Sequence, residues 1–422
     1  MLTYHGFNII HVKGAPGVEP REIRIIDTIF SLRPSLARRL ITGEKTMRII
    51  HVAPFYTPVI GGVEEVVRKI AEYTASRGYE TYVVTYNRLR NGGIGSLPRE
   101  EEINGVHVIR LKPDFTWSNG TYSSELPQVI RRLKPDIVHV HVWRHPHVFQ
   151  VARLRRELGF RAILHGHAPF QRLSQLGLIT WLYHKIVDNI GRKILDYYDY
   201  YVSETPYERD FILQRFHIFK EKITIIPIGI EKPVLRDMQK YRSNYEILYL
   251  GRISREKNVD FLIRSIKYVI NNVKDIKLLL IGPDEGLMKW IYNYTKANNF
   301  SHVIKYLGPV YGDKKYSFYI SATIYALPSL YEAFGKALLE AGIVGTPSVI
   351  TGYGGQLYAA PPNIASLWAR PNPRDYAEAI STILTDKVLW RKLSQGAIEW
   401  AELHTWDKIL LKYDKLYNEL TK

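Results

Sequence analysis

The chain has 422 residues, and at about 150 residues per domain this length predicts two or three domains. Cysteine is absent, which excludes a disulfide scaffold, a thiolate metal site and a cysteine nucleophile. The 58 lysines and arginines against 41 acidic residues give a net charge of +17. Because this excess is spread along the chain rather than gathered in a tail, it argues against nucleic acid and favours anionic small molecules or lipid headgroups as partners.

The N-terminal residues differ from the rest of the chain. Residues 1–46 lack a sustained alternation of strand and helix patterns, whereas a buried strand opens directly after Met47. We expect these residues to be an extension that is disordered or not part of the native chain; the alternative is a surface helix over Ile23–Leu40. The sequence has no secretory signal and no run of about 18 apolar residues, so we expect a cytoplasmic protein.

From Met47 onward, apolar runs typical of strands alternate with helical patterns. Strands are expected at Arg48–Ala53, Thr81–Tyr86, Val106–Leu111, Asp136–His141, Arg161–His165, Tyr200–Ser203 and Ile223–Ile226. Helices are expected at Val63–Ser76, Glu125–Leu133, Val148–Leu158 and Ile179–Leu195. Strands separated by helices need crossover connections, so residues 47–228 are predicted to form an α/β domain with a parallel sheet.

The alternation starts again after an expected linker at residues 229–244. Strands are expected at Glu246–Gly251, Lys277–Ile281, Val303–Leu307, Thr323–Leu327 and Ser348–Ile350. Helices are expected at Val259–Ile270, Leu287–Ala297, Gly335–Gly345, Arg374–Leu384, Lys387–Glu402 and Trp406–Leu420. Residues 245–402 are thus predicted to form a second α/β domain, and a final helix occupies residues 403–422. Open sheets bind ligands at the carboxyl ends of their strands, which places a ligand between the two domains.

Two cations lie where the strand Glu246–Gly251 ends, just before a helix. Arg252 and Lys257 would project from this turn toward the other domain. They suit a diphosphate, because arginine makes forked contacts and lysine acts as a point charge. The alternative is a solvated basic turn.

A second candidate site follows the strand Thr323–Leu327. A helix is expected to begin near Gly335, where glycine allows close approach and exposed N–H groups attract a phosphate. Glu332 lies just outside this helix and Glu340 lies inside it, and eight helical residues span about 12 Å. That length suits a sugar–diphosphate–ribose ligand, with Glu340 near the ribose and Glu332 near the sugar. The alternative is two ordinary glutamates of an amphipathic helix.

The spacing of Glu332 and Glu340, with Phe334-Gly335 between them, resembles the hallmark of the retaining glycosyltransferases of family four. Those enzymes use nucleotide sugars and have the GT-B architecture, in which two Rossmann-like domains face each other. Further segments are similar to motifs of the same family: the donor-phosphate motif at Gly251–Lys257, the glycine loop at Gly61-Gly62, the histidine segment at Leu164–His167 and the C-terminal crossover that begins at Trp406.

The resemblance implies roles for individual residues. Arg252 and Lys257 would neutralise the leaving diphosphate, Glu332 would contact the donor sugar, and His165 would reach that sugar from the N-terminal domain. Glu340 would hold the ribose. The remaining donor contacts would come from Gly61, Gly62, Pro309, Val310, Phe334 and Gly335. Asn258 and Gln356 depart from the family pattern, which has glycine and an acidic residue there, and these departures concern the identity of the donor.

Four histidines close together in the sequence raise the question of a metal site. His139 and His141 share one face of a strand, but Pro146 breaks the element. We therefore expect no third ligand to converge, and no metal site. The sequence also lacks an Asp-x-Asp pair that could hold a divalent cation. A metal-independent reaction without a cofactor is expected, in which Arg252 and Lys257 compensate the charge.

The predicted activity is that of a hexosyltransferase-type enzyme. It would move a sugar from a UDP- or GDP-sugar to a hydroxyl of a glycan or lipid-linked acceptor, with retention. The stretch Gln171–Leu195 mixes apolar and aromatic side chains with basic ones, which suits an anionic membrane surface; the alternative is a core helix. The alternative function is a nucleotide-sugar epimerase or hydrolase on the same scaffold, which would act without an acceptor.

Overall fold

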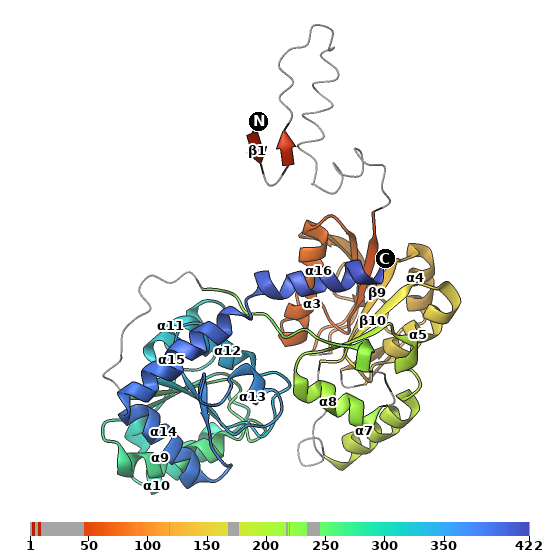
Figure 1. Ribbon diagram of the computed structural model, residues 1–422. Coiled ribbons are helices and arrows are strands. Elements are labelled where there is room, and N and C mark those ends of the chain that lie inside the picture. The colour runs from red at the N-terminus through yellow and green to blue at the C-terminus, as the bar shows by residue number, and fades with distance from the viewer. Residues whose placement is uncertain are drawn as a thin grey trace.

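The computed structural model describes residues 2–4, 7–9, 46–90, 92–117, 119–167, 177–216, 218, 220–233 and 245–421. In this part of the chain two α/β domains stand side by side (Figure 1), each built on a largely parallel sheet. The predicted fold class is therefore confirmed. The alternative helix over Ile23–Leu40 and most of the expected linker lie outside the described residues, so the status of residues 1–46 and the domain boundaries stay predictions. Strands β1 (Leu2–Tyr4) and β2 (Phe7–Ile9) pair with each other.

The N-terminal domain contains a sheet with the strand order β12-β11-β10-β9-β3-β4-β6-β5. Its strands are β3 (Arg48–Val52), β4 (Glu80–Tyr86), β5 (Glu100–Ile103), β6 (Val106–Leu111), β9 (Ile137–His141), β10 (Arg161–His165), β11 (Tyr200–Ser203) and β12 (Ile223–Ile225). Only the outer pair of this sheet, β5 and β6, is antiparallel. Its helices are α3 (Gly62–Ser76), α4 (Glu125–Leu133), α5 (Pro146–Leu158), α7 (Leu178–Gly191) and α8 (Pro206–Arg215), and a short hairpin joins β7 (Phe115–Trp117) to β8 (Gly120–Tyr122).

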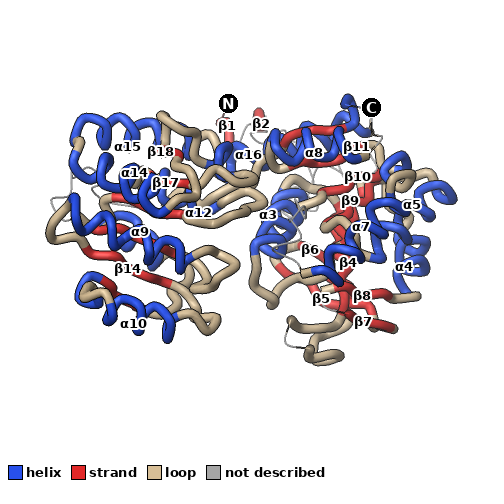
Figure 2. The backbone as a smooth tube through the Cα atoms, turned by 90° about the horizontal axis from the view of Figure 1, so that it is seen from below, coloured by secondary structure: helices blue, strands red, loops and turns tan. Residues whose placement is uncertain are grey.

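The C-terminal domain contains a parallel sheet with the order β15-β14-β13-β16-β17-β18, and Figure 2 shows the helices around it. Its strands are β13 (Glu246–Leu250), β14 (Lys277–Ile281), β15 (Ile304–Tyr306), β16 (Ile324–Leu327), β17 (Ser348–Ile350) and β18 (Ser366–Trp368). Its helices are α9 (Val259–Asn272), α10 (Met288–Ala297), α11 (Lys314–Ser321), α12 (Lys336–Gly342), α13 (Gln356–Ala359), α14 (Pro373–Thr385) and α15 (Lys387–Glu402). Helix α12 begins where expected but ends earlier, because the chain turns at Gly345 (φ +77°) into β17.

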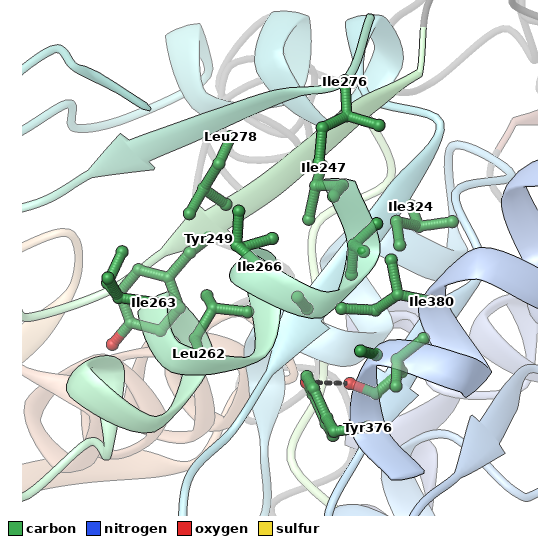
Figure 3. Packing of buried hydrophobic residues seen from close by; sticks show 14 of the residues in the cluster. Ile247, Tyr249, Leu262, Ile263, Ile266, Ile276, Leu278, Ile324, Tyr376 and Ile380 are labelled. Carbon is green, nitrogen blue, oxygen red and sulfur yellow. Dashed lines mark hydrogen bonds between the residues drawn. The ribbon is translucent and has the colours of Figure 1, made fainter. Parts of the chain in front are cut away.

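One of the two buried clusters of the C-terminal domain lies between its sheet and the helices α9 and α14. Figure 3 shows Ile247 and Leu278 of the sheet pointing toward Ile266 and Ile380 of these helices. Fully burying one side chain of this kind stabilises the fold by about 1.5–3 kcal/mol. Tyr376 places its hydroxyl in the same core and donates a hydrogen bond of 2.8 Å to the carbonyl of Val349. The polar atom of this large side chain is thus satisfied inside an apolar layer.

Helix α16 (Trp406–Leu420) belongs to the N-terminal domain although it ends the chain. It leaves α15 and lies across the N-terminal domain beside α3 (Figure 1). Its apolar face packs against buried residues of that domain, among them Ile49 and Val66. The buried residues that α16 contributes are Trp406, Ile409, Leu410, Tyr413, Leu416, Tyr417 and Leu420. The predicted crossover of the C-terminal helix is confirmed.

The two connections between the domains pair with each other. The N–H of Ile230 donates to the carbonyl of His404 at 2.9 Å, and the N–H of Trp406 donates to the carbonyl of Ile230 at 3.0 Å. Gly229 packs against the indole of Trp406, where an added Cβ would lie 2.4 Å from a ring atom. Both chain crossings therefore meet at one place between the domains.

Candidate active site

The predicted donor residues follow neighbouring strands of the C-terminal sheet. Arg252 and Lys257 come after β13, and Glu332 comes after β16, which pairs with β13 in parallel. The carboxyl ends of parallel strands meet at one edge of a sheet, so the two loops lie together. Lys257 Nζ lies 2.9 and 3.0 Å from the two carboxylate oxygens of Glu332. The structure thus brings together two residues from separate sequence motifs.

Arg252 is held by carboxylates on both sides. Its guanidinium lies 3.1 Å from Glu285, in the loop after the neighbouring strand β14, and 3.1 Å from Glu256. The side chain of Arg252 remains 43% exposed, so solvent screens these ion pairs. Exposed pairs contribute about 0.2–1 kcal/mol each. Arg252 can therefore exchange a carboxylate for a bound anion at little cost.

Asn258 explains one departure from the family pattern. Its backbone is left-handed, with φ +58°, directly before α9. Glycine adopts this conformation freely, and asparagine tolerates it better than most residues. Asn258 also donates a side-chain hydrogen bond of 3.0 Å to the carbonyl of Pro328, in the loop after β16. The asparagine therefore fits a glycine position and ties together the two loops that carry Lys257 and Glu332.

Gly354 and Gly355 lie against the backbone of Glu332. The N–H of Gly355 donates to the Glu332 carbonyl at 2.8 Å. A Cβ on Gly354, whose φ is +68°, would lie 2.2 Å from that same carbonyl oxygen. The glycines are thus needed where the loop after β17 approaches Glu332.

Gln356, the second departure from the family pattern, is buried and joins these loops. Its side-chain oxygen accepts hydrogen bonds of 3.1 Å from the N–H groups of Thr351 and Gly352. Its amide nitrogen donates to the carbonyl of Ser329 at 2.6 Å. A carboxylate could accept the first two bonds but could not donate the third. The amide therefore serves the loop structure here.

Glu340 of α12 is buried and lies beside two partly exposed lysines. Its carboxylate is 2.7 Å from Lys315 Nζ on α11 and 3.4 Å from Lys336 Nζ one turn away. Lys336 also reaches the N-terminal domain, where its Nζ lies 2.6 Å from a carboxylate oxygen of Glu65 on α3. Sequence reasoning missed Lys315, Lys336 and Glu65, because their meeting depends on the packing of α11, α12 and α3. The ribose contact of Glu340 stays a prediction.

The remaining predicted donor residues lie at the ends of secondary-structure elements. Phe334 is buried and its ring packs against Tyr358, and Gly335 (φ +95°) precedes α12. Pro309 is exposed and Val310 is half-buried, both after β15. In the N-terminal domain, Gly61 and Gly62 begin α3. A Cβ on Gly62 would have no atom within 4 Å, whereas a Cβ on Gly61 would lie 2.1 Å from a carboxylate oxygen of Glu64.

His165 lies inside the N-terminal domain in a cluster of imidazoles at the carboxyl ends of the central strands. It is buried, and its ring stacks on His167 with centroids 3.8 Å apart. Glu204 lies 3.4 Å from His165 Nε2 and 2.8 Å from His167 Nδ1. Burial alone would raise the pKa of Glu204, but its contacts with these two imidazoles outweigh burial and lower the pKa. Burial lowers the pKa of His165 to about 4, so the imidazole is neutral near pH 7. Its contact with a sugar stays a prediction.

The expectation that no third imidazole could converge on His139 and His141 is wrong. The third ring comes from neighbouring strands instead of from the residues after Pro146. His51 pairs with His139 in register across β3 and β9, and His165 pairs with His141 across β9 and β10. These histidine side chains therefore meet on one face of the sheet, across β3, β9 and β10.

Helix α7 presents a stripe of exposed apolar side chains. Ile179, Leu182, Ile186 and Ile190 recur at helical spacing, and Ile179 is 86% exposed. Lys185 Nζ lies 5.1 Å from the centre of the Trp181 ring on the same helix. The preceding residues 171–176 of the expected membrane-binding stretch lie outside the described residues. Within the described ranges, none of the helices combines the length and apolar composition that a membrane span needs.

The opposite face of α7 is anchored by Asp188. Its carboxylate accepts hydrogen bonds from Trp143 Nε1 at 3.0 Å, Arg144 Nε at 2.7 Å and Arg215 Nε at 2.9 Å. Burial alone would raise the pKa of Asp188, but the hydrogen bond and charge of Arg144 outweigh it and lower the pKa. The helix is thus fixed on one side while its apolar stripe stays exposed.

Solved structures with the same arrangement of domains are glycosyltransferases of the GT-B fold. Sucrose-phosphate synthase from Thermosynechococcus elongatus matches with a TM-score of 0.74 and 20% identity, over 89% of this chain and 99% of that one. The Anabaena protein HepE in complex with UDP matches with a TM-score of 0.69 and 15% identity, over 88% of this chain and all of the other. The fold thus defines a GT-B protein.

Sequence comparisons identify the family. Residues 60–232 match the family described as Glycosyltransferase Family 4, and residues 235–400 match Glycosyl transferases group 1. An uncharacterized glycosyltransferase of Methanocaldococcus jannaschii is 25% identical over 88% of this chain and 98% of its own length. D-inositol 3-phosphate glycosyltransferase of Corynebacterium diphtheriae is 22% identical over 89% and 95%. The chain therefore belongs to the family-four type of glycosyltransferases, which these two matches describe domain by domain. It is a hexosyltransferase-type enzyme.

Proposed function

We propose that this enzyme transfers a sugar from a nucleotide sugar to an acceptor hydroxyl, with retention at the anomeric carbon and without a metal ion at the diphosphate. The ion pair between Lys257 and Glu332 carries this proposal. It lies where the loops after β13 and β16 meet, beside Arg252. The cation that we assign to the diphosphate and the carboxylate that we assign to the sugar are thus in contact.

The charges of the donor explain how these residues would act. A departing nucleoside diphosphate gains negative charge, while the sugar carbon becomes positive. Arg252 and Lys257 would exchange their carboxylate partners for the diphosphate, and Glu332 would then be free to face the sugar. Preorganised charges of this kind lower the barrier because they need no rearrangement during the reaction.

The nucleoside would lie toward α12, with its ribose against Glu340 and its base against the backbone at Pro309 and Val310. We propose a UDP- or GDP-sugar as the donor. Support for UDP comes from the HepE structures, which hold UDP and UDP-glucose. Glu340 and its neighbouring lysines offer both acceptors and donors of hydrogen bonds to ribose hydroxyls.

The experiment that tests the proposal compares turnover of UDP- and GDP-sugars with and without a mixture of glycan and lipid-linked acceptors. A transferase should consume donor slowly on its own and much faster with an acceptor, and NMR of the product should show the donor's anomeric configuration. Full turnover of donor alone would support the epimerase or hydrolase instead. An inverted product would contradict retention. Chelator treatment should leave the rate unchanged.

We further propose that the acceptor is presented at an anionic membrane surface that α7 contacts from the cytoplasmic side. The stripe of Ile179, Leu182, Ile186 and Ile190 would enter the headgroup boundary, as apolar faces of interfacial helices do. Lys185, next to this stripe, would face anionic headgroups, each basic residue near the surface contributing about 1 kcal/mol. The net charge of +17 acts in the same direction.

A further inference from the structure

Three imidazoles of the N-terminal domain lie in one buried group that the proposed reaction does not use. His51 on β3 and His139 and His141 on β9 are fully buried. Parallel pairing sets His51 beside His139, and the alternation of side chains along β9 puts His141 on the same face. One ring nitrogen from each of the three lies within 4.8 Å of the other two. We propose that His51, His139 and His141 bind a divalent transition-metal ion of the zinc class.

The nitrogen positions support coordination. His51 Nδ1 and His141 Nε2 are 3.1 Å apart. Two imidazole nitrogens bound tetrahedrally to one ion, each at about 2.0–2.1 Å from it, are separated by about 3.3 Å. One ring nitrogen of His139 lies within 4.8 Å of both, so binding of the ion would have to draw this nitrogen closer. These two nitrogens of His51 and His141, on adjacent strands, thus already lie at about the separation expected of two ligands of one ion.

An orphaned ring nitrogen points to the same conclusion. His139 Nε2 is buried and has no hydrogen-bond partner among the described residues. Leaving a buried polar atom unsatisfied costs about 1–3 kcal/mol. A bound ion would satisfy His139 Nε2 directly.

The second nitrogen of two of the rings is already held. His139 Nδ1 lies 2.7 Å from the hydroxyl of Tyr417 on α16, and His141 Nδ1 lies 3.2 Å from His167 Nε2. His167 in turn contacts Glu204 through Nδ1 at 2.8 Å. Metal-ligating histidines regularly make such outer contacts, which fix the ring and direct the other nitrogen to the ion.

The ligand set defines the class of ion and its role. Three imidazoles without a thiolate or carboxylate suit Zn²⁺, Co²⁺, Ni²⁺ or Cu²⁺ rather than Mg²⁺ or Ca²⁺. The ion would join the two central strands β3 and β9 and, through Tyr417, hold α16. Because it lies in the domain opposite Arg252 and Lys257, it leaves charge compensation at the diphosphate to those cations.

The test measures metal content of the full chain. Protein loaded with Zn²⁺ and then exposed briefly to a chelator should retain about one ion per chain, and Co²⁺-loaded protein should show the visible absorption of nitrogen-coordinated cobalt. His51→Gln and His139→Gln should lose this tightly held ion, whereas His302→Gln, at an exposed histidine, should keep it. Tyr417→Phe keeps all three ligands and should weaken affinity about 10–100-fold.

The wild-type measurement decides the proposal even where a variant fails to fold. Folded wild-type protein that retains neither ion after loading would overturn it. Retention in His139→Gln equal to that in wild-type protein and in His302→Gln would place the ion elsewhere and would also overturn it. Activity is not needed for either readout, so the outcome does not depend on the identity of the donor or acceptor.

Discussion

Lys336, the first residue of α12 in the C-terminal domain, forms an ion pair of 2.6 Å with Glu65 of the N-terminal domain. The same lysine contacts Glu340 at 3.4 Å. The predicted ribose-binding carboxylate is therefore linked through one side chain to the opposite domain.

The first prediction concerns this contact between the domains. Lys336→Met and Glu65→Gln should each lower kcat/KM about two- to fivefold, because an ion pair of this exposure is worth about 0.2–1 kcal/mol. A double-mutant cycle should show that the two effects are not additive. The matched control is Arg131 with Glu157, an ion pair within the N-terminal domain, whose removal should leave kcat/KM unchanged. Additive effects at Lys336 and Glu65 would contradict a functional link.

The second prediction concerns the two cations of the donor loop. Arg252→Ala and Lys257→Ala should each lower turnover about 10²–10³-fold, the usual cost of removing one preorganised charge. Both should also weaken binding of the nucleoside diphosphate, measured by calorimetric titration. Arg255→Ala, at an exposed residue of the same loop, is the control and should retain activity. Normal diphosphate affinity in both variants would rule out the proposed site.

The third prediction separates the two glutamates. Glu332→Ala should damage turnover and leave nucleoside diphosphate affinity nearly unchanged, because the proposed function places this side chain against the sugar. Glu340→Gln should weaken nucleotide binding through the lost ribose contact. Titration beside a turnover assay tests both. The assignment fails if Glu332→Ala loses nucleotide affinity while Glu340→Gln keeps both affinity and rate.

The fourth prediction concerns the anchor of α7. Asp188→Asn should lower the free energy of unfolding by about 3–5 kcal/mol, because it leaves Arg144 buried without its carboxylate partner. Urea denaturation measures this. The lowered pKa of Asp188 means that its contribution is present above the unfolded pKa, about 3.9, and is lost as pH falls through the folded value. The variant should therefore lose less stability than wild type on acidification below about pH 4, whereas Asp210→Asn, at an exposed residue, should behave as wild type.

The fifth prediction tests the membrane surface. Wild-type protein should sediment with anionic vesicles at low salt and be released as salt rises, because headgroup attraction is screened. Ile186→Glu should abolish sedimentation, since it places a negative charge in the apolar stripe. Val388→Glu makes the same change at a residue of α15 that is 77% exposed and should have no effect. If wild-type protein stays in solution at low salt, or if both variants behave alike, the membrane proposal is wrong.

Strongly periodic elements could be predicted from the sequence. The helices α4, α15 and α16 have the expected boundaries, because their apolar residues recur at helical spacing over several turns. Strand β5 was missed, because three of its four residues are glutamates at the edge of the sheet. Helix α8 was also missed, although it carried a signal: Thr205 precedes Pro206 and accepts a hydrogen bond from the N–H of Glu208, a typical helix start.

The candidate site likewise has residues that the sequence predicts and contacts that it does not. Lys257 and Glu332 could be proposed from local motifs, because each lies in a loop directly after a strand. Their contact depends on β13 and β16 being neighbours in the sheet although about 75 residues separate them in the chain. The convergence of His51 with His139 has the same cause. Spacing within one segment cannot reveal such meetings, because strand order is a property of the whole domain.

The position of α16 has a consequence for synthesis at the ribosome. The N-terminal domain is translated first, yet part of its core, around Ile49 and Val66, is covered by residues from the final helix. Domains generally fold in the order in which they emerge. Here the apolar face of the first domain that α16 covers stays exposed until the second domain has been synthesised. The first domain can complete its core only after Leu420 has left the exit tunnel. A chain stopped after α15 would therefore carry a finished second domain and an unfinished first one.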